Sequence, residues 1–264
     1  MKLKLLLISF LTIGICSFSY AQSNKRNNSQ NTSKNNQTTV TKPGNTNTTA
    51  TNIPGASNPR RPATANPQGL TSTDLMEPEK NGGRPFYDVY SNIRPEMTMA
   101  FSPEDLSQEK MSTLLYIACG VTDKENRCYT AFTTNQDATI DIYVITREQI
   151  MKYDRLEHKL LVIRKVHFLE KVTMQREMPI DAPIAIVYVC NPNSFKPEEN
   201  DDNDIFITKG LNCGAIMQNV FLYCANEDLS CKAISIPNNV KAEFLKHINS
   251  RDAEVLYGQI IGRR

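Results

Sequence analysis

The amino-acid composition changes abruptly near residue 75, and this change limits how much of the chain can fold. Between Gln22 and Leu75, 27 of 54 residues are Asn, Thr or Ser, and none is aromatic. Such a segment buries too little apolar surface to offset the entropy lost on ordering. We therefore predict a disordered linker over residues 22–79, and over residues 80–264 a stretch of the size of one domain.

The first 21 residues have the three parts of a secretory signal peptide. Lys2 and Lys4 precede an apolar run from Leu5 to Cys16, and the small residues Ser19 and Ala21 fit a cleavage site. We expect cleavage after Ala21, a periplasmic or secreted location, and no transmembrane segment in the mature chain.

The linker carries six basic residues and no acid before Asp74, whereas the remainder of the chain is mildly acidic. Nucleic acid would need aromatic side chains between the basic ones for base stacking, and the linker has none. The pattern predicts a solvated spacer and no nucleic-acid binding. Adhesion of the basic linker to an anionic surface is the alternative.

Six cysteines follow the signal peptide, and their spacing matches no zinc motif, so no metal site is expected. Several lie in apolar runs, which favours small buried thiols. In an exported chain two disulfides are also possible, Cys119 with Cys128 or Cys224 with Cys231.

The first half of the domain predicts a helix and a hairpin. Ser102 fits a helix N-cap before Pro103, and Gly120 fits the end of the same helix. The β-rich residues 139–145 and 160–163 are predicted to form a hairpin with a polar turn between them. Residues 166–176 are predicted to be helical.

The second half predicts a buried centre. The run Pro183–Cys190 is apolar on both faces, as in a central strand covered on both sides. Residues 197–204 are acidic but lack the EF-hand glycine and distal glutamate, so we expect a solvated loop. A long helix over residues 208–226 is apolar around most of its circumference and is predicted to be buried. A strand at 230–236, a helix at 238–248 and a strand at 254–261 complete an α+β domain with a central mixed β-sheet flanked by helices.

No generic catalytic motif occurs: the sequence has no nucleophile elbow, phosphate loop or dinucleotide fingerprint. The three histidines, His158, His167 and His247, fall in a predicted turn and on charged helix faces. A surface role is expected for them, and the residues by themselves leave the chemistry open.

Five segments, however, carry a shared pattern in a fixed order. They are Leu106–Val121, Asp141–Val144, Asp181–Ile184, Gly214–Leu222 and Gln259–Gly262. Together they resemble the nitroreductase family, and within it the exported subgroup close to the dehydrogenases of thiazole-peptide synthesis. The resemblance covers about residues 85–264.

The resemblance implies a nitroreductase-like fold and a homodimer that binds FMN in a cleft between its subunits. Such an enzyme takes a hydride from a reduced nicotinamide and passes electrons to a small-molecule acceptor, such as a nitro group or a quinone. The flavin supplies the redox chemistry, so the protein needs no catalytic triad.

The resemblance also implies which residues bind the cofactor. In the family motif Arg-x-Ser-x-Arg this chain keeps the last arginine, Arg94, and has Asn92 in place of serine. In the motif Pro-Ser-x-x-Asn-x-Gln, Thr133 keeps a hydroxyl and Gln136 replaces the asparagine amide.

Arg263 and Arg264 end the chain where the family often places phosphate-binding cations, and with Arg94 they are expected to hold the FMN phosphate. Gln218 and Asn219 are expected to form an amide network at a dimer interface rather than to contact the cofactor. Because the cofactor motifs have lost contacts, the alternative is a nitroreductase-fold protein that has lost flavin and acts as a periplasmic binding or scaffold module.

Overall fold

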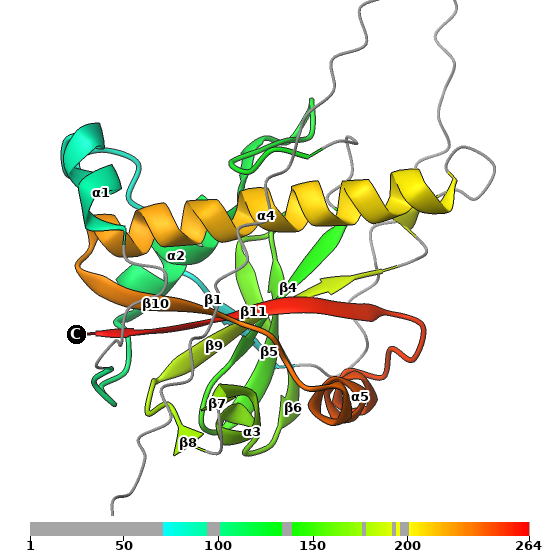
Figure 1. The fold of residues 1–264 in the computed structure, drawn as a ribbon. Coiled ribbons are helices and arrows are strands. Elements are labelled where there is room, and N and C mark those ends of the chain that lie inside the picture. The colour runs from blue at the N-terminus through cyan, green and yellow to red at the C-terminus, as the bar shows by residue number, and fades with distance from the viewer. Residues whose placement is uncertain are drawn as a thin grey trace, which may run out of the picture. The chain divides into compact units, whose positions relative to one another are not determined.

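The computed structural model describes residues 71–93, 101–133, 139–175, 178–191, 194–195 and 201–263. They belong to one compact unit, residues 61–264. Its centre is a seven-stranded sheet in the order β1-β6-β5-β4-β9-β11-β10 (Figure 1). The strands are β1 (Ser72–Asp74), β4 (Ile140–Ile145), β5 (Gln149–Asp154), β6 (Lys159–Lys165), β9 (Ile184–Cys190), β10 (Leu229–Ile234) and β11 (Glu254–Arg263).

Helices cover both faces of this sheet. On one face lie α2 (Gln108–Cys119) and the long α4 (Asp202–Asn226), and on the other lie α3 (Leu169–Thr173) and α5 (Asn238–His247) (Figure 1). The short α1 (Phe86–Asn92) packs beside α4. Two small hairpins pair β2 (Val121–Asp123) with β3 (Cys128–Tyr129), and β7 (Met174–Gln175) with β8 (Met178–Pro179).

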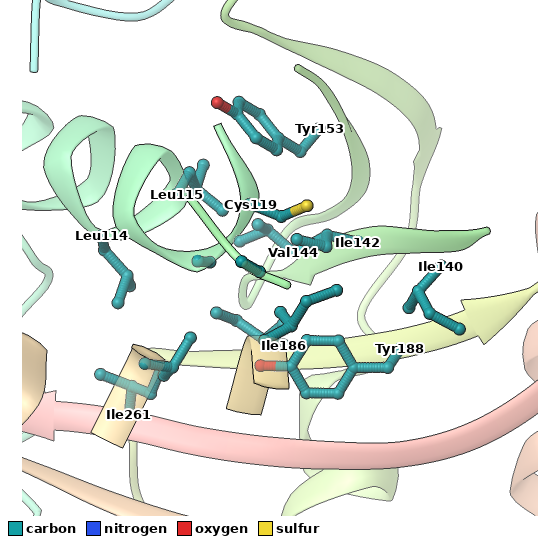
Figure 2. Close-up of a cluster of buried hydrophobic side chains, with 14 of the residues drawn as sticks. Leu114, Leu115, Cys119, Ile140, Ile142, Val144, Tyr153, Ile186, Tyr188 and Ile261 are labelled. Carbon is teal, nitrogen blue, oxygen red and sulfur yellow. The ribbon is translucent and has the colours of Figure 1, made fainter. Parts of the chain in front are cut away.

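The central strand is β9, and all seven of its side chains are buried, which confirms the prediction for Pro183–Cys190. Figure 2 shows Tyr188 and Ile186 of β9 with Ile142 and Val144 of β4 and with Leu114 and Leu115 of α2. The sheet was expected to be mixed, but each strand pair described in it is antiparallel. Helices on both faces give an antiparallel central strand the same continuous apolar pattern as a buried parallel strand, so the pattern could not distinguish them.

Two predicted elements of the first half differ most from the structure. The helix predicted from Ser102 begins at Gln108, because Ser107 is its N-cap and accepts a hydrogen bond from the Lys110 backbone at 3.3 Å. Its end at Gly120 is confirmed. The predicted hairpin of residues 139–145 and 160–163 is wrong, because β5 lies between them and pairs with both strands.

The remaining elements follow the prediction more closely. The helix expected over 166–176 is only the five residues of α3. The strands β10 and β11 and the helix α5 lie where the pattern predicts them. Residues 71–79, the end of the predicted linker, contain β1, whose three residues pair with β6.

The helix α4 begins six residues before its predicted start, because Asp201 is its N-cap and accepts a hydrogen bond from the Asp204 backbone at 2.8 Å. One face of α4 is buried and packs on the sheet, as predicted. The other face is exposed toward its N-terminal end, where Phe206 is 74% exposed and Leu211 is 52% exposed. The prediction that the helix is buried around most of its circumference is therefore wrong for this half of α4.

Five of the six cysteines are buried, as expected, and Cys128 is exposed. All six thiols are free in the structure, so neither disulfide suggested by the sequence is formed there. Among the described residues, no group of histidine, cysteine or acidic side chains is arranged to hold a metal ion. None of the described helices has the length and apolar character needed to cross a membrane.

Candidate functional site

The turn between α4 and β10 anchors the segment that leads into α1. The Arg84 backbone N–H donates to Oδ1 of Asn226, the last residue of α4, at 2.7 Å. The Arg84 guanidinium pairs with Asp228 in the turn. Asp228 itself has a positive φ of 55°, a conformation that Asp tolerates better than most residues. These contacts hold the start of α1 at the end of the sheet where β10 begins.

Arg263 lies at the same end of the sheet. It is the last residue of β11 and is directly opposite Leu229, the first residue of β10. Its carbonyl accepts a hydrogen bond from the Ser102 backbone at 2.8 Å, and its guanidinium pairs with Glu104 Oε2 at 2.8 Å. The side chains of Arg263 and Glu104 are 46% and 66% exposed, so the cation is open to solvent although it has an anionic partner.

A close contact joins two of the segments on which the family resemblance rests. A Cβ atom on Gly262 would lie 2.8 Å from Cδ of Pro183 and 3.2 Å from Cδ1 of Phe101. The first distance is too short for any larger residue. The closing glycine thus allows the end of β11 to pack against the proline that precedes β9, and so fixes the position of Arg263.

The loop that contains Thr133 is fixed by two helices. The Thr130 hydroxyl donates to the Tyr116 carbonyl at 2.7 Å and accepts from the Gly120 backbone at 2.9 Å, which closes the end of α2. The Asn219 amide of α4 donates to the carbonyls of Ile117 and Thr130 at 3.0 and 3.1 Å.

The Asn219 amide therefore donates its hydrogen bonds to carbonyls of its own chain. The sequence had instead suggested that this side chain lies at a dimer interface. A polar side chain in the middle of a mostly apolar helix was the sequence signal, and its role is to position the loop of Thr133.

The predicted cofactor residues fall into separate groups. Asn92 is the half-buried last residue of α1, and Arg263 is the last residue of β11. Thr133 is half-buried in the loop held by Asn219. Asn219 lies seven residues before Asn226, which is about 10 Å along α4. Arg94, Gln136 and Arg264 lie outside the described residues.

These side chains suit the binding of an anionic ligand better than a reaction by protein groups alone. Arg263 supplies a solvent-exposed guanidinium that is paired with Glu104, and Thr133 supplies a half-buried hydroxyl. The helix α1 exposes three aromatic rings, those of Phe86, Tyr87 and Tyr90, which offer flat surfaces for stacking. The chemistry of these side chains fits a flavin mononucleotide, with its phosphate, polar ring edge and flat ring system.

One hydrogen-bonded group was not predicted as such. His158, expected in a surface role, bonds Tyr153 through Nδ1 and Ser112 through Nε2, each at 2.8 Å. Ser112 donates in turn to the Met76 carbonyl, so the group ties residues 71–79 to α2. Burial lowers the pKa of His158, and the positive charge of Lys80 lowers it further, while a hydrogen bond with the Met76 backbone opposes these effects.

Two of the three comparisons with known proteins found matches. The family model described as "Nitroreductase family" matches residues 98–263. A candidate nitroreductase from Ralstonia eutropha JMP134 has a similar structure, with 25% identity and a TM-score of 0.66 over 73% of this chain and 89% of that chain. No curated protein matches the chain significantly.

Two further solved structures share the fold at lower identity. One is the Escherichia coli microcin synthetase McbBCD complex, with 14% identity and a TM-score of 0.53 over 73% of this chain and 78% of that chain. The other is a candidate nitroreductase from Anabaena variabilis ATCC 29413, with 15% identity and a TM-score of 0.57 over 74% of this chain and 42% of that chain.

Proposed function

The chain belongs to the nitroreductase family, whose model matches residues 98–263, and from this premise we propose that it is an exported oxidoreductase that uses FMN. The family and the fold support a general oxidoreductase role. The observation that carries the proposal is the match of the family model over this range, which includes Arg263 and Thr133.

In this proposal the residues of the chain bind and orient the cofactor. Arg263, with Arg94 and Arg264, would hold the phosphate through charge-assisted hydrogen bonds. Asn92, Thr133 and Gln136 would hydrogen-bond the remaining polar atoms. When bound, FMN supplies hydride and electron transfer between a reduced nicotinamide and a nitro, quinone or similar acceptor.

A second candidate function is favoured by the charges at the end of the sheet. Arg84 and Arg263 are each already paired with a carboxylate, from Asp228 and Glu104. An incoming phosphate has to compete with these anions. A chain in which the carboxylates prevail would keep the fold and serve as a periplasmic binding or scaffold module without flavin.

The absorbance spectrum of the mature chain, residues 22–264, separates the two candidates. An FMN enzyme is expected to show a flavin band at about 450 nm, either as purified or after incubation with FMN and removal of the excess. Anaerobic addition of a reduced nicotinamide should bleach the band, and a quinone should restore it. If no band is retained after incubation with excess FMN, the oxidoreductase proposal is wrong and the binding module is favoured.

The exposed face of α4 supports a homodimer. Phe206, Ile207 and Leu211 are exposed apolar residues on this face. Gly210 and Gly214 lie between and beside them, and a Cβ atom on either would have no neighbour within 4 Å. Small residues four apart on a helix allow a second helix to approach closely. We take a second copy of this chain as the partner, because the family is typically dimeric.

Light scattering coupled to size exclusion tests the dimer. The wild-type chain is expected to have twice the mass of one copy, and Leu211→Asp should have the mass of a single copy. Leu156→Asp is the matched control, since Leu156 is a leucine of similar exposure, 48%, in the turn between β5 and β6. A dimer that persists in Leu211→Asp at micromolar concentration would move the interface away from this face.

Export rests on the residues of the signal sequence, Lys2 to Ala21. Expression of the full chain in a bacterial host should yield a periplasmic or secreted protein that begins at Gln22. Intact mass and N-terminal sequencing measure this directly. An uncleaved chain confined to the cytoplasm would contradict the proposed location.

A further inference from the structure

Two buried cysteines meet where the long helix α4 turns into β10. Cys224 lies in the last turn of α4 and Cys231 lies in β10, and both side chains are almost fully buried in the same apolar cluster. After burial, a hydrogen bond from the neighbouring Cys224 thiol is the next cause that raises the pKa of Cys231. Only six residues separate them in the chain.

The neighbouring contacts fix this arrangement from a third element. The Gln259 amide of β11 donates to the Met217 carbonyl of α4 at 3.2 Å and to the Cys231 sulfur at 3.3 Å. Met217 is seven residues before Cys224, two helical turns along the same face of α4. Gln259 thus holds β10 against the face of α4 that carries Cys224.

We propose that Cys224 and Cys231 form a disulfide bond when the exported chain folds in an oxidising compartment. The other pair suggested by the sequence lacks this geometry, because Cys119 is fully buried at the end of α2 whereas Cys128 is exposed on β3. The proposal rests on the proposed export and does not depend on flavin binding, so either can fail without the other.

The oxidation is a two-step thiol exchange. One thiolate attacks the disulfide of an oxidant, either a small disulfide such as oxidised glutathione or a thiol oxidoreductase, and one oxidant thiol leaves. The second thiolate then attacks the mixed disulfide and releases the other oxidant thiol. The two cysteines lose two protons and two electrons, and the oxidant disulfide is reduced to two thiols.

This exchange takes place before the core closes. In the folded protein, burial is the main cause that raises the pKa of Cys231, and the hydrogen bond with Cys224 raises it further. A protonated, inaccessible thiol is a poor nucleophile. The bond therefore forms while α4 and β10 are coming together, which the experiment has to reproduce.

The mature chain is reduced, denatured and refolded in parallel with a glutathione redox buffer and with dithiothreitol. After acid denaturation the free thiols are labelled with a maleimide and counted by intact mass. Refolding with glutathione should give four labelled thiols, and refolding with dithiothreitol should give six. Six labelled thiols under both conditions overturn the proposal.

Peptide mapping identifies the bonded pair. Trypsin leaves residues 210–232 as one peptide, and cleavage between Glu227 and Asp228 then divides it. The two halves should stay joined until reduction in the wild type and in the control Cys213→Ala, and should separate in Cys224→Ala. Halves that stay joined in Cys224→Ala, or that separate in unreduced wild type, overturn the assignment.

Discussion

The two faces of the central sheet have different cores. The face under α2 and α4 contains the five buried thiols and most of the buried polar side chains, including Ser112, Asn212 and Gln259. The face under α3 and α5 is built from aliphatic and aromatic residues, with Phe168 and Phe244 at its centre. One face is fixed by directional hydrogen bonds and the other by apolar packing.

This difference follows the position of the candidate site. On the α4 face, Gln259 ties β11 to α4, Asn219 ties α4 to the loop of Thr133, and Asn212 ties α4 to Thr139 before β4. Hydrogen bonds of this kind fix the register of elements that apolar packing alone would leave adjustable. The α5 face supplies burial without such constraints, so changes there should affect stability and leave cofactor binding intact.

The largest expected loss of stability is on the sheet face under α3 and α5, which we call the apolar face. Phe244 packs edge-on against Tyr143, with ring centroids 5.4 Å apart, and lies 6.0 Å from Phe168. Phe244→Ala should lower the free energy of unfolding by about 3–5 kcal/mol, because it leaves a cavity in a closed core. Denaturant unfolding measures this. Leu245→Ala, on the half-buried flank of α5, should cost less, and FMN affinity should be unchanged in both folded variants.

The accuracy of the sequence prediction also differs between the two faces. The helix α5 was located within one residue because Val240, Phe244 and Ile248 form an apolar face at helical spacing. The starts of α2 and α4 were missed, because several Ser and Asp residues there could serve as N-caps, and tertiary contacts select Ser107 and Asp201.

For the site, sequence likeness identified Arg263 and Thr133 as candidates, but the carboxylate of Glu104 beside Arg263 was not foreseeable. Glu104 lies in a predicted helix, and only the fold brings it to the end of β11. The amide of Asn219 could be recognised as unusual in an apolar helix, yet its carbonyl partners come from residues about 90 and 100 positions earlier. Hydrogen bonds between residues so far apart leave no local sequence pattern from which they could be predicted.

The next largest loss of stability is expected on the sheet face under α2 and α4, which contains most of the buried polar side chains. The Tyr188 hydroxyl donates to Gln259 Oε1 in the fully buried core. Tyr188→Phe should cost about 1–3 kcal/mol of unfolding free energy, because it leaves the Gln259 carbonyl oxygen without its donor. Tyr143→Phe is the matched control on the apolar face and should cost less than about 1 kcal/mol. Equal costs would mean that the two faces do not differ in the way described.

A smaller effect should appear with pH. The folded-state pKa of His158 is below its ordinary 6.5, mainly through burial, so the unfolded chain binds the proton more readily. The stabilising effect is complete above pH 6.5 and is lost as the pH falls from 6.5 through the folded-state pKa. Because the ring is only half-buried, the change should be below about 1 kcal/mol. The charged and titratable groups around it are Lys80, Tyr116 and Tyr153.

Denaturant unfolding at pH 7.5 and pH 5.5 measures this loss of unfolding free energy. His158→Gln should show a smaller loss of stability between the two values than the wild type, whereas the exposed His167→Gln should behave as the wild type does. If His158→Gln keeps the full pH dependence, His158 is not its source.

The smallest stability effect is expected where the largest functional effect is proposed. Arg263 and Glu104 form an exposed ion pair, so Arg263→Ala and Glu104→Gln should each change the unfolding free energy by less than about 1 kcal/mol. If Arg263 holds the FMN phosphate, Arg263→Ala should weaken FMN binding by roughly tenfold to a hundredfold. Glu104→Gln should instead strengthen FMN binding, because the phosphate no longer competes with a carboxylate.

Arg164→Ala, which removes an exposed arginine on β6, controls for overall charge. Fluorescence titration with FMN gives the four affinities, and equal weakening in Arg263→Ala and Arg164→Ala would reduce Arg263 to a general surface charge.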